Sequence, residues 1–134
     1  MSRIQNVQLV FDTLNAQVAA ATTVSVFDSG KIIRYSNGAA AYAITLPAPV
    51  EGLNYRFLCS TAGTNTVTIT NPGVDRFFGI LQAAGAQVAC SGKNNIAMGA
   101  AAGAAAVVGD YLYVISDGTG WFVEGFGQNA GSIA

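Results

Sequence analysis

The sequence contains no histidine, and only 10% of its 134 residues are charged, whereas about 25% is typical of soluble domains. Without histidine the commonest general base and the commonest metal ligand are missing, and neither a Ser-His-Asp nor a Cys-His catalytic arrangement can be built. The formal net charge is −1, so nothing in the composition indicates binding to nucleic acid or to an anionic membrane. We therefore expect a structural or binding module and not an enzyme.

The few carboxylates offer no recognisable metal or cofactor site. Most of them lie beside turns, where aspartate commonly accepts hydrogen bonds from the backbone. The seven carboxylates are Asp12, Asp28, Glu51, Asp75, Asp110, Asp117 and Glu124. The loop Asp117-Gly118-Thr119 has a single carboxylate, which is too few for calcium. No glycine-rich phosphate loop with its lysine occurs either. We expect no bound metal and no cofactor.

The sequence also has little that would mark export or a membrane span. Its longest uncharged run of small residues, 96–109, is shorter than the roughly 20 residues that a spanning helix needs. The N-terminus lacks the pattern of a signal peptide, and no Asn-x-Ser/Thr sequon is present. Cys59 and Cys90 both lie in strand-like segments. Buried free thiols are the favoured interpretation for them, and a disulfide is the alternative.

From about residue 24 onward, short segments separated by turn residues predict strands. Val24–Phe27 and Lys31–Tyr35 flank the turn sequence Asp28-Ser29-Gly30, and Asn37-Gly38 is a strong hairpin signal. The following segments alternate in polarity, with one set of side chains expected on each face: Tyr42, Ile44 and Leu46, then Leu53, Tyr55, Phe57 and Cys59, then Val67 and Ile69 opposite Thr66, Thr68 and Thr70.

The last strand pair is the clearest in the chain. Segments 111–116 and 121–124 are rich in aromatic and β-branched residues and flank the turn sequence Asp117-Gly118-Thr119-Gly120. Strands at this spacing with glycine-rich turns favour an all-β fold, an antiparallel β-sandwich or jelly-roll-like domain over residues 24–134. Tyr111, Tyr113, Trp121 and Val123 are expected to form the subunit core or interface. Sugar binding by Tyr113 or Trp121 is the weaker interpretation, because aromatic residues in strands mostly pack in cores.

Two segments do not follow this pattern of short strands separated by turns. Residues 1–23 contain no glycine, and we interpret them as an extended N-terminal arm; the alternative is the first strand of the domain. The arm carries apolar side chains suited to contact a larger scaffold: Ile4, Val7, Leu9 and Phe11. The second segment, 97–109, is rich in alanine and glycine. Its small side chains suit a close backbone approach, and a tolerated loop is the alternative.

The scarcity of charge carries the main functional expectation. A domain of this size normally uses charged residues to stay soluble and monomeric, and interface cores are depleted in charge. Edge strands of a sandwich also need closure, charge or another chain to cover them. We therefore expect an obligate homo-oligomer whose arm adds a strand to a neighbour or to a larger scaffold.

The strings Ile44-Thr45-Leu46-Pro47-Ala48-Pro49, Tyr55-Arg56-Phe57 and Val67-Thr68-Ile69, together with Ser116–Val123, resemble small β-structured virion proteins of tailed bacteriophages and other icosahedral double-stranded DNA viruses. The resemblance covers about residues 42–134, and the alanine-rich segment departs from it. It implies head decoration (cement) proteins, capsid fibres or knobs, or tail-fibre modules, often trimeric, and it transfers no catalytic residue.

Among these roles a decoration or minor capsid protein is favoured, because the chain is short and has no coiled-coil or repeat-rich shaft. Such a protein would bind the major capsid protein or another virion protein as a homotrimer, on the capsid surface of a virion assembled in the host cytoplasm. The alternative is a tail-fibre or spike knob that binds a host receptor or glycan.

Overall fold

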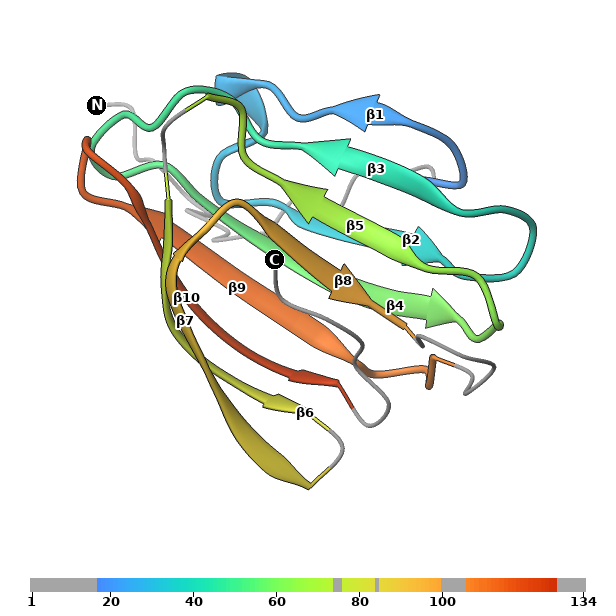
Figure 1. Cartoon of the computed structure of the whole chain (residues 1–134). Helices are drawn as coiled ribbons and strands as arrows, with labels where there is room; N and C mark the ends of the chain where they lie inside the picture. Colours follow the sequence, from blue (N-terminus) through green and yellow to red (C-terminus); the bar gives the residue numbers. More distant parts are fainter. Residues whose placement is uncertain (1–16, 74–75, 84, 100–105, 128–134) are drawn as a thin grey trace, which may run out of the picture.

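The computed structural model describes residues 17–73, 76–83, 85–99 and 106–127, which form ten strands, one short 3₁₀ helix and no α-helix (Figure 1). The expected all-β class is confirmed. In chain order the elements are β1 (Thr22–Thr23), η1 (Val26–Asp28), β2 (Ile32–Ser36), β3 (Tyr42–Thr45), β4 (Asn54–Thr61), β5 (Val67–Thr70), β6 (Phe77–Ala83), β7 (Ala86–Lys93), β8 (Asn95–Met98), β9 (Tyr111–Ser116) and β10 (Trp121–Gly127).

The strands form two sheets, one with the order β1-β3-β5-β8 and the other with the order β2-β4-β9-β10-β6-β7. The sequence predicted purely antiparallel pairing, but both sheets contain parallel and antiparallel pairs. The pairs β1–β3, β3–β5, β2–β4 and β6–β10 are parallel, and the other four described pairs are antiparallel. Within the segment interpreted as an arm, Thr22–Thr23 pairs with β3, and Val18 forms a bridge with Tyr35.

Strands β1 to β5 alternate between the two sheets, so neighbours within one sheet are two elements apart in the chain, and the pairs β1–β3, β3–β5 and β2–β4 are parallel. Asn37-Gly38 therefore does not close a hairpin, since β2 and β3 lie in different sheets. The buried Asn37 amide Nδ2 donates to the carbonyl oxygens of Asn65 (2.7 Å) and Met98 (3.0 Å), while Asn65 Nδ2 donates to the Asn37 carbonyl (3.1 Å). These hydrogen bonds join the loop that follows β2 to the loop that follows β4 and to the end of β8.

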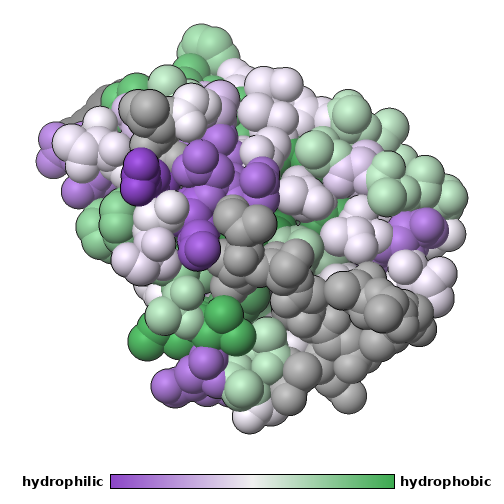
Figure 2. All heavy atoms as spheres, in the orientation of Figure 1, coloured by the Kyte–Doolittle hydropathy of each residue, from purple (hydrophilic) through white to green (hydrophobic). Residues whose placement is uncertain are grey.

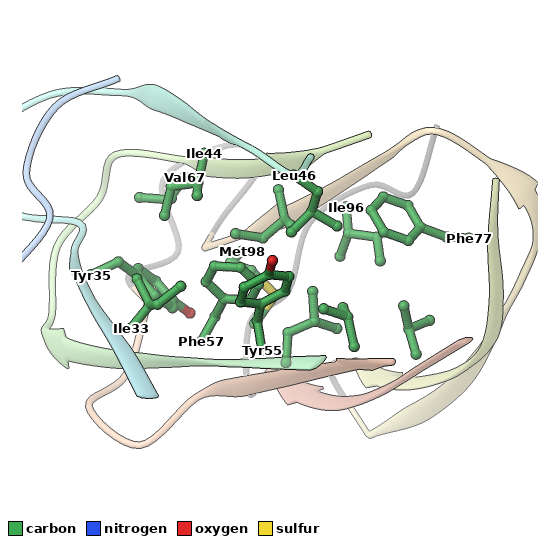
Figure 3. Close-up of a cluster of buried hydrophobic side chains, with 14 of the residues drawn as sticks. Ile33, Tyr35, Ile44, Leu46, Tyr55, Phe57, Val67, Phe77, Ile96 and Met98 are labelled. Atoms are coloured by element: carbon green, nitrogen blue, oxygen red, sulfur yellow. The ribbon is translucent and has the colours of Figure 1, made fainter. Parts of the chain in front are cut away.

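The core fills the space between the two sheets. Figure 3 shows Ile44, Val67 and Leu46 pointing from one layer toward Ile33, Tyr55 and Phe57 of the other. All six side chains are fully buried. Five of them hold inward positions of the expected alternations, and the sixth, Ile33, comes from β2. Cys59 and Cys90 are both buried and free, which confirms the favoured interpretation of the two cysteines.

One expected strand is wrong. Residues 24–27 do not form a strand: Ser25 is the N-cap of η1, and Val26 and Phe27 are its first two residues. The Ser25 hydroxyl accepts from the Phe27 N–H, and the Asp28 carboxylate accepts from the Ser25 N–H. This reciprocal capping satisfies backbone donors that a strand neighbour would otherwise have to satisfy. The hairpin of β6 and β7, and strand β8, were not expected from the sequence.

Candidate interaction surface

The side of the six-stranded sheet that faces away from the core is called here the outer face. The strand registers arrange its side chains in three rows. The first row contains Phe78, Phe122, Ile115 and Asn54. The second contains Ile80, Glu124, Tyr113, Arg56 and Ile32. The third contains Gln82, Phe126, Tyr111, Leu58 and Arg34.

Large apolar side chains dominate this face and remain exposed. Six of them are between 37% and 52% exposed: Phe78, Ile80, Tyr111, Ile115, Phe122 and Phe126. The rings of Phe78 and Phe122 pack together with their centroids 6.2 Å apart. Single exposed apolar residues are ordinary, but a contiguous group of this kind marks a surface that another molecule covers.

Two charged residues lie at the centre of the outer face. Arg56 and Glu124 occupy the same row on either side of Tyr113. The Arg56 guanidinium carbon lies 5.4 Å from the centroid of the Tyr113 ring, a favourable cation–π distance. A shallow groove of about 430 Å³ runs past these residues and is bordered by Ile32, Leu58 and Tyr111. A sugar could not stack on the side of the Tyr113 ring that the guanidinium occupies.

Charged residues make up only 10% of the chain. Figure 2 shows one side of the molecule, on which hydrophilic colour is confined to a few patches among white and green residues. At the end where η1 lies, Phe27 is 88% exposed. Its loop is held in place, because the Tyr55 hydroxyl donates to the Ser25 carbonyl and the Asn54 N–H donates to the Ser29 hydroxyl. These hydrogen bonds hold the backbone of the loop against β4, and the Phe27 side chain projects from it as an exposed apolar tip.

The four residues expected at the subunit core or interface divide into two pairs. Trp121 and Val123 point into the core, where the Trp121 ring packs 5.8 Å from that of Tyr55. Tyr111 and Tyr113 lie on the outer face, because successive residues of β9 and β10 alternate between the two sides. The arm residues Ile4, Val7, Leu9 and Phe11 lie outside the described residues, as do residues 100–105 of the alanine-rich segment.

Sequence reasoning missed the phenylalanines and the isoleucine of β6 and β10 on the outer face. The signal was present in β10, whose sequence Trp-Phe-Val-Glu-Gly-Phe-Gly places large apolar residues at both odd and even positions. An isolated sheet with one face in water alternates apolar and polar residues. A strand that is apolar on both sides predicts cover on both sides.

The described titratable groups mostly serve local structure. Asp28 pairs with Lys31 at 3.2 Å, and Asp110 accepts from the Val107 N–H at 3.1 Å. Burial raises the pKa of the Cys59 and Cys90 thiols, which disfavours the reactive thiolate.

Over the described ranges, no group of three or more His, Cys, Asp or Glu side chains lies close enough to hold a metal ion. Nor does the described part of the chain contain a helix long and apolar enough to cross a membrane. Comparison with known proteins adds no relative: no family model, curated protein or solved structure matches this chain.

Proposed function

We propose that this protein is a virion structural protein, a capsid decoration or minor capsid protein that binds the capsid surface as an oligomer and catalyses no reaction. The observation that supports the proposal is the contiguous apolar outer face of the six-stranded sheet. The proposal includes the finer fold expected from the strand spacing and the turn residues, a jelly-roll-like sandwich over residues 24–134 with residues 1–23 as an arm.

The size of the apolar group indicates that assembly would be favourable. Full burial of one large apolar side chain contributes about 1.5–3 kcal/mol. Six such side chains on the outer face are roughly half exposed, so covering them contributes on the order of 6 kcal/mol before the costs of association. Repeated modest contacts on a lattice then add up to stable attachment without any catalytic chemistry.

Attachment to the shell requires a second contact besides the one between subunits. The arm residues Ile4, Val7, Leu9 and Phe11 are the candidates from the sequence, and the exposed tip of Phe27 is a candidate from the fold. In this proposal the outer face joins copies of the chain, and the arm or the tip binds the major capsid protein.

Purified particles from the source of this chain test the proposal. We expect mass spectrometry to find the protein at a fixed ratio to the major capsid protein, and immunogold labelling to place it on the particle surface. Purified protein should bind particles that have been stripped of it, and deletion of residues 1–11 should abolish binding while the circular dichroism spectrum stays unchanged. Absence from particles would refute the proposal, and full binding by the truncated protein would refute the role of the arm.

A tail-fibre or spike knob that binds a receptor or glycan is the second candidate. The observation that favours it is the groove, which places Tyr111 and Tyr113 beside Arg56 and Glu124. This alternative predicts binding to host cells or to their polysaccharide, measurable by calorimetry and lost in Tyr111→Ala. A decoration protein shows no such binding.

A further inference from the structure

We infer that the occupant of the outer face is a second copy of this chain, packed face to face about a two-fold axis that runs along β9. The inference rests on the proposed function only in assigning this face to assembly. It adds the partner, the orientation and the contacts.

The positions of the charged residues carry the inference. β9 lies between β4, which carries Arg56, and β10, which carries Glu124. A rotation of 180° about an axis along β9 turns one outer face onto the other and exchanges the β4 side with the β10 side. Arg56 of one copy then faces Glu124 of the second copy, and the symmetry repeats this ion pair, as in any isologous interface.

The apolar residues of the second and third rows match under the same rotation, whereas Phe122 of the first row faces the polar Asn54 of the second copy. Ile80 on β6 faces Ile32 of the second copy, because β6 and β2 both lie two strands from β9. Phe126 on β10 faces Leu58 on β4 of the second copy, at the same height along the strands.

The outward residues of β9 itself lie on the axis. Tyr111, Tyr113 and Ile115 therefore meet their own equivalents in the second copy. In the third row, Gln82 faces Arg34 of the second copy, since these residues again lie two strands to either side of β9. The rotation thus brings together no two residues of like charge in the three rows.

The area is sufficient for a specific dimer. With strands about 4.8 Å apart and alternate residues about 6.8 Å apart, three rows across five strands outline on the order of 500 Å². Two such faces bury about 1,000 Å², the size at which specific interfaces begin. Two sheets packed face to face lie about 10 Å apart, and an axis along β9 keeps the β9 strands of the two copies parallel.

Charge exchange tests this arrangement in the full-length chain, with sedimentation equilibrium as the measurement. Glu124→Arg alone and Arg56→Glu alone each place like charges opposite one another twice, so we expect the dissociation constant of the dimer to rise at least about 100-fold. The double variant Arg56→Glu/Glu124→Arg restores opposite charges at both positions, and its dissociation constant should return to within about tenfold of the parent value. Glu51→Arg, the same charge change on an exposed loop, is the matched control and should leave dimerisation unchanged.

A second measurement does not depend on the charge variants folding. Tyr113→Cys places a thiol on the axis, whereas Cys59 and Cys90 are buried. A short bismaleimide should therefore link two copies of the Tyr113→Cys protein. It should not link copies of Thr68→Cys, whose side chain lies on the other sheet.

Several results would overturn the inference. They are a monomer at tens of micromolar, a trimer, a dimer that the double variant fails to restore, and a dimer that forms only after residues 1–16 are deleted. The last result would mean that the chain covers its own face. These outcomes are separable from the proposed function, because particle analysis reports attachment to virions whatever the state of the free protein.

Discussion

Replacing Gly79 with alanine tests the least tolerant contact in the six-stranded sheet. Gly79 lies in β6 with a φ angle of 141°, a conformation that L residues rarely adopt. A Cβ atom at this position would overlap the carbonyl oxygen of Val123 on the parallel neighbour β10. Backbone and not a flexible side chain blocks the methyl group, so the two strands must separate locally.

The expected cost has two parts. The unfavourable φ angle contributes about 1–3 kcal/mol, and each ladder hydrogen bond lost between the separated strands contributes about 1 kcal/mol. We therefore expect the free energy of unfolding to fall by about 3–4 kcal/mol, a large part of the 5–15 kcal/mol typical of a domain. Gly85→Ala is the control, because Gly85 has a φ angle of 81° but no atom within 4 Å of its Cβ position. It should cost only about 1–2 kcal/mol.

Urea unfolding followed by circular dichroism measures both variants. The midpoints should differ while the slopes stay equal, since the surface exposed on unfolding is the same. Equal midpoints for Gly79→Ala and Gly85→Ala would refute the reasoning. They would mean that β6 and β10 do not approach one another in this register.

Three further predictions concern titratable side chains. Burial raises the pKa of Tyr55 from its ordinary value near 10 to about 12. The unfolded chain therefore loses this proton first, and the free energy of unfolding falls as pH rises from about 10 to 12; Tyr55→Phe should make that fall shallower in pH-dependent urea titrations. The buried thiols of Cys59 and Cys90 should react with Ellman's reagent only after denaturant is added, and immediate reaction of either one would contradict the fold. The pKa of Asp117 is lowered by hydrogen bonds from the Thr119 N–H and hydroxyl, so NMR titration should find it below the ordinary aspartate value, and Thr119→Ala should raise it.

The strands with period-two alternation could be predicted from the sequence because one of their faces is covered and the other is not. β4 is the clearest example: Tyr55, Phe57 and Cys59 are buried, while Arg56 between them is exposed. The glycine-rich turn between β9 and β10 gave the last hairpin for a similar local reason, since Asp117 accepts hydrogen bonds from the Thr119 and Gly120 N–H groups within the turn.

The strand pairing could not be predicted in this way, because it depends on hydrogen bonds between distant residues. Asn37-Gly38 has the local sequence of a hairpin, yet the Asn37 amide binds Asn65 and Met98, which lie 28 and 61 positions further along the chain. Gly63 adds a second nonlocal requirement, since a Cβ atom there would overlap the Asn37 carbonyl. Because of these contacts, the segment that contains Asn37-Gly38 connects two strands of different sheets and does not form a hairpin turn.

The exposed apolar residues of the outer face could not be predicted from the sequence for a different reason. Trp121 and Phe122 are adjacent aromatic residues on opposite sides of β10, and a count of hydrophobic residues does not distinguish them. Only the fold shows that the four-stranded sheet covers the Trp121 side and that Phe122 remains 46% exposed. Strands that are apolar on both sides occur where both sides are covered, and within the described residues the four-stranded sheet covers only the Trp121 side. A face whose only central charges are an arginine and a glutamate, placed on either side of one tyrosine, matches a second copy of itself without any change in sequence.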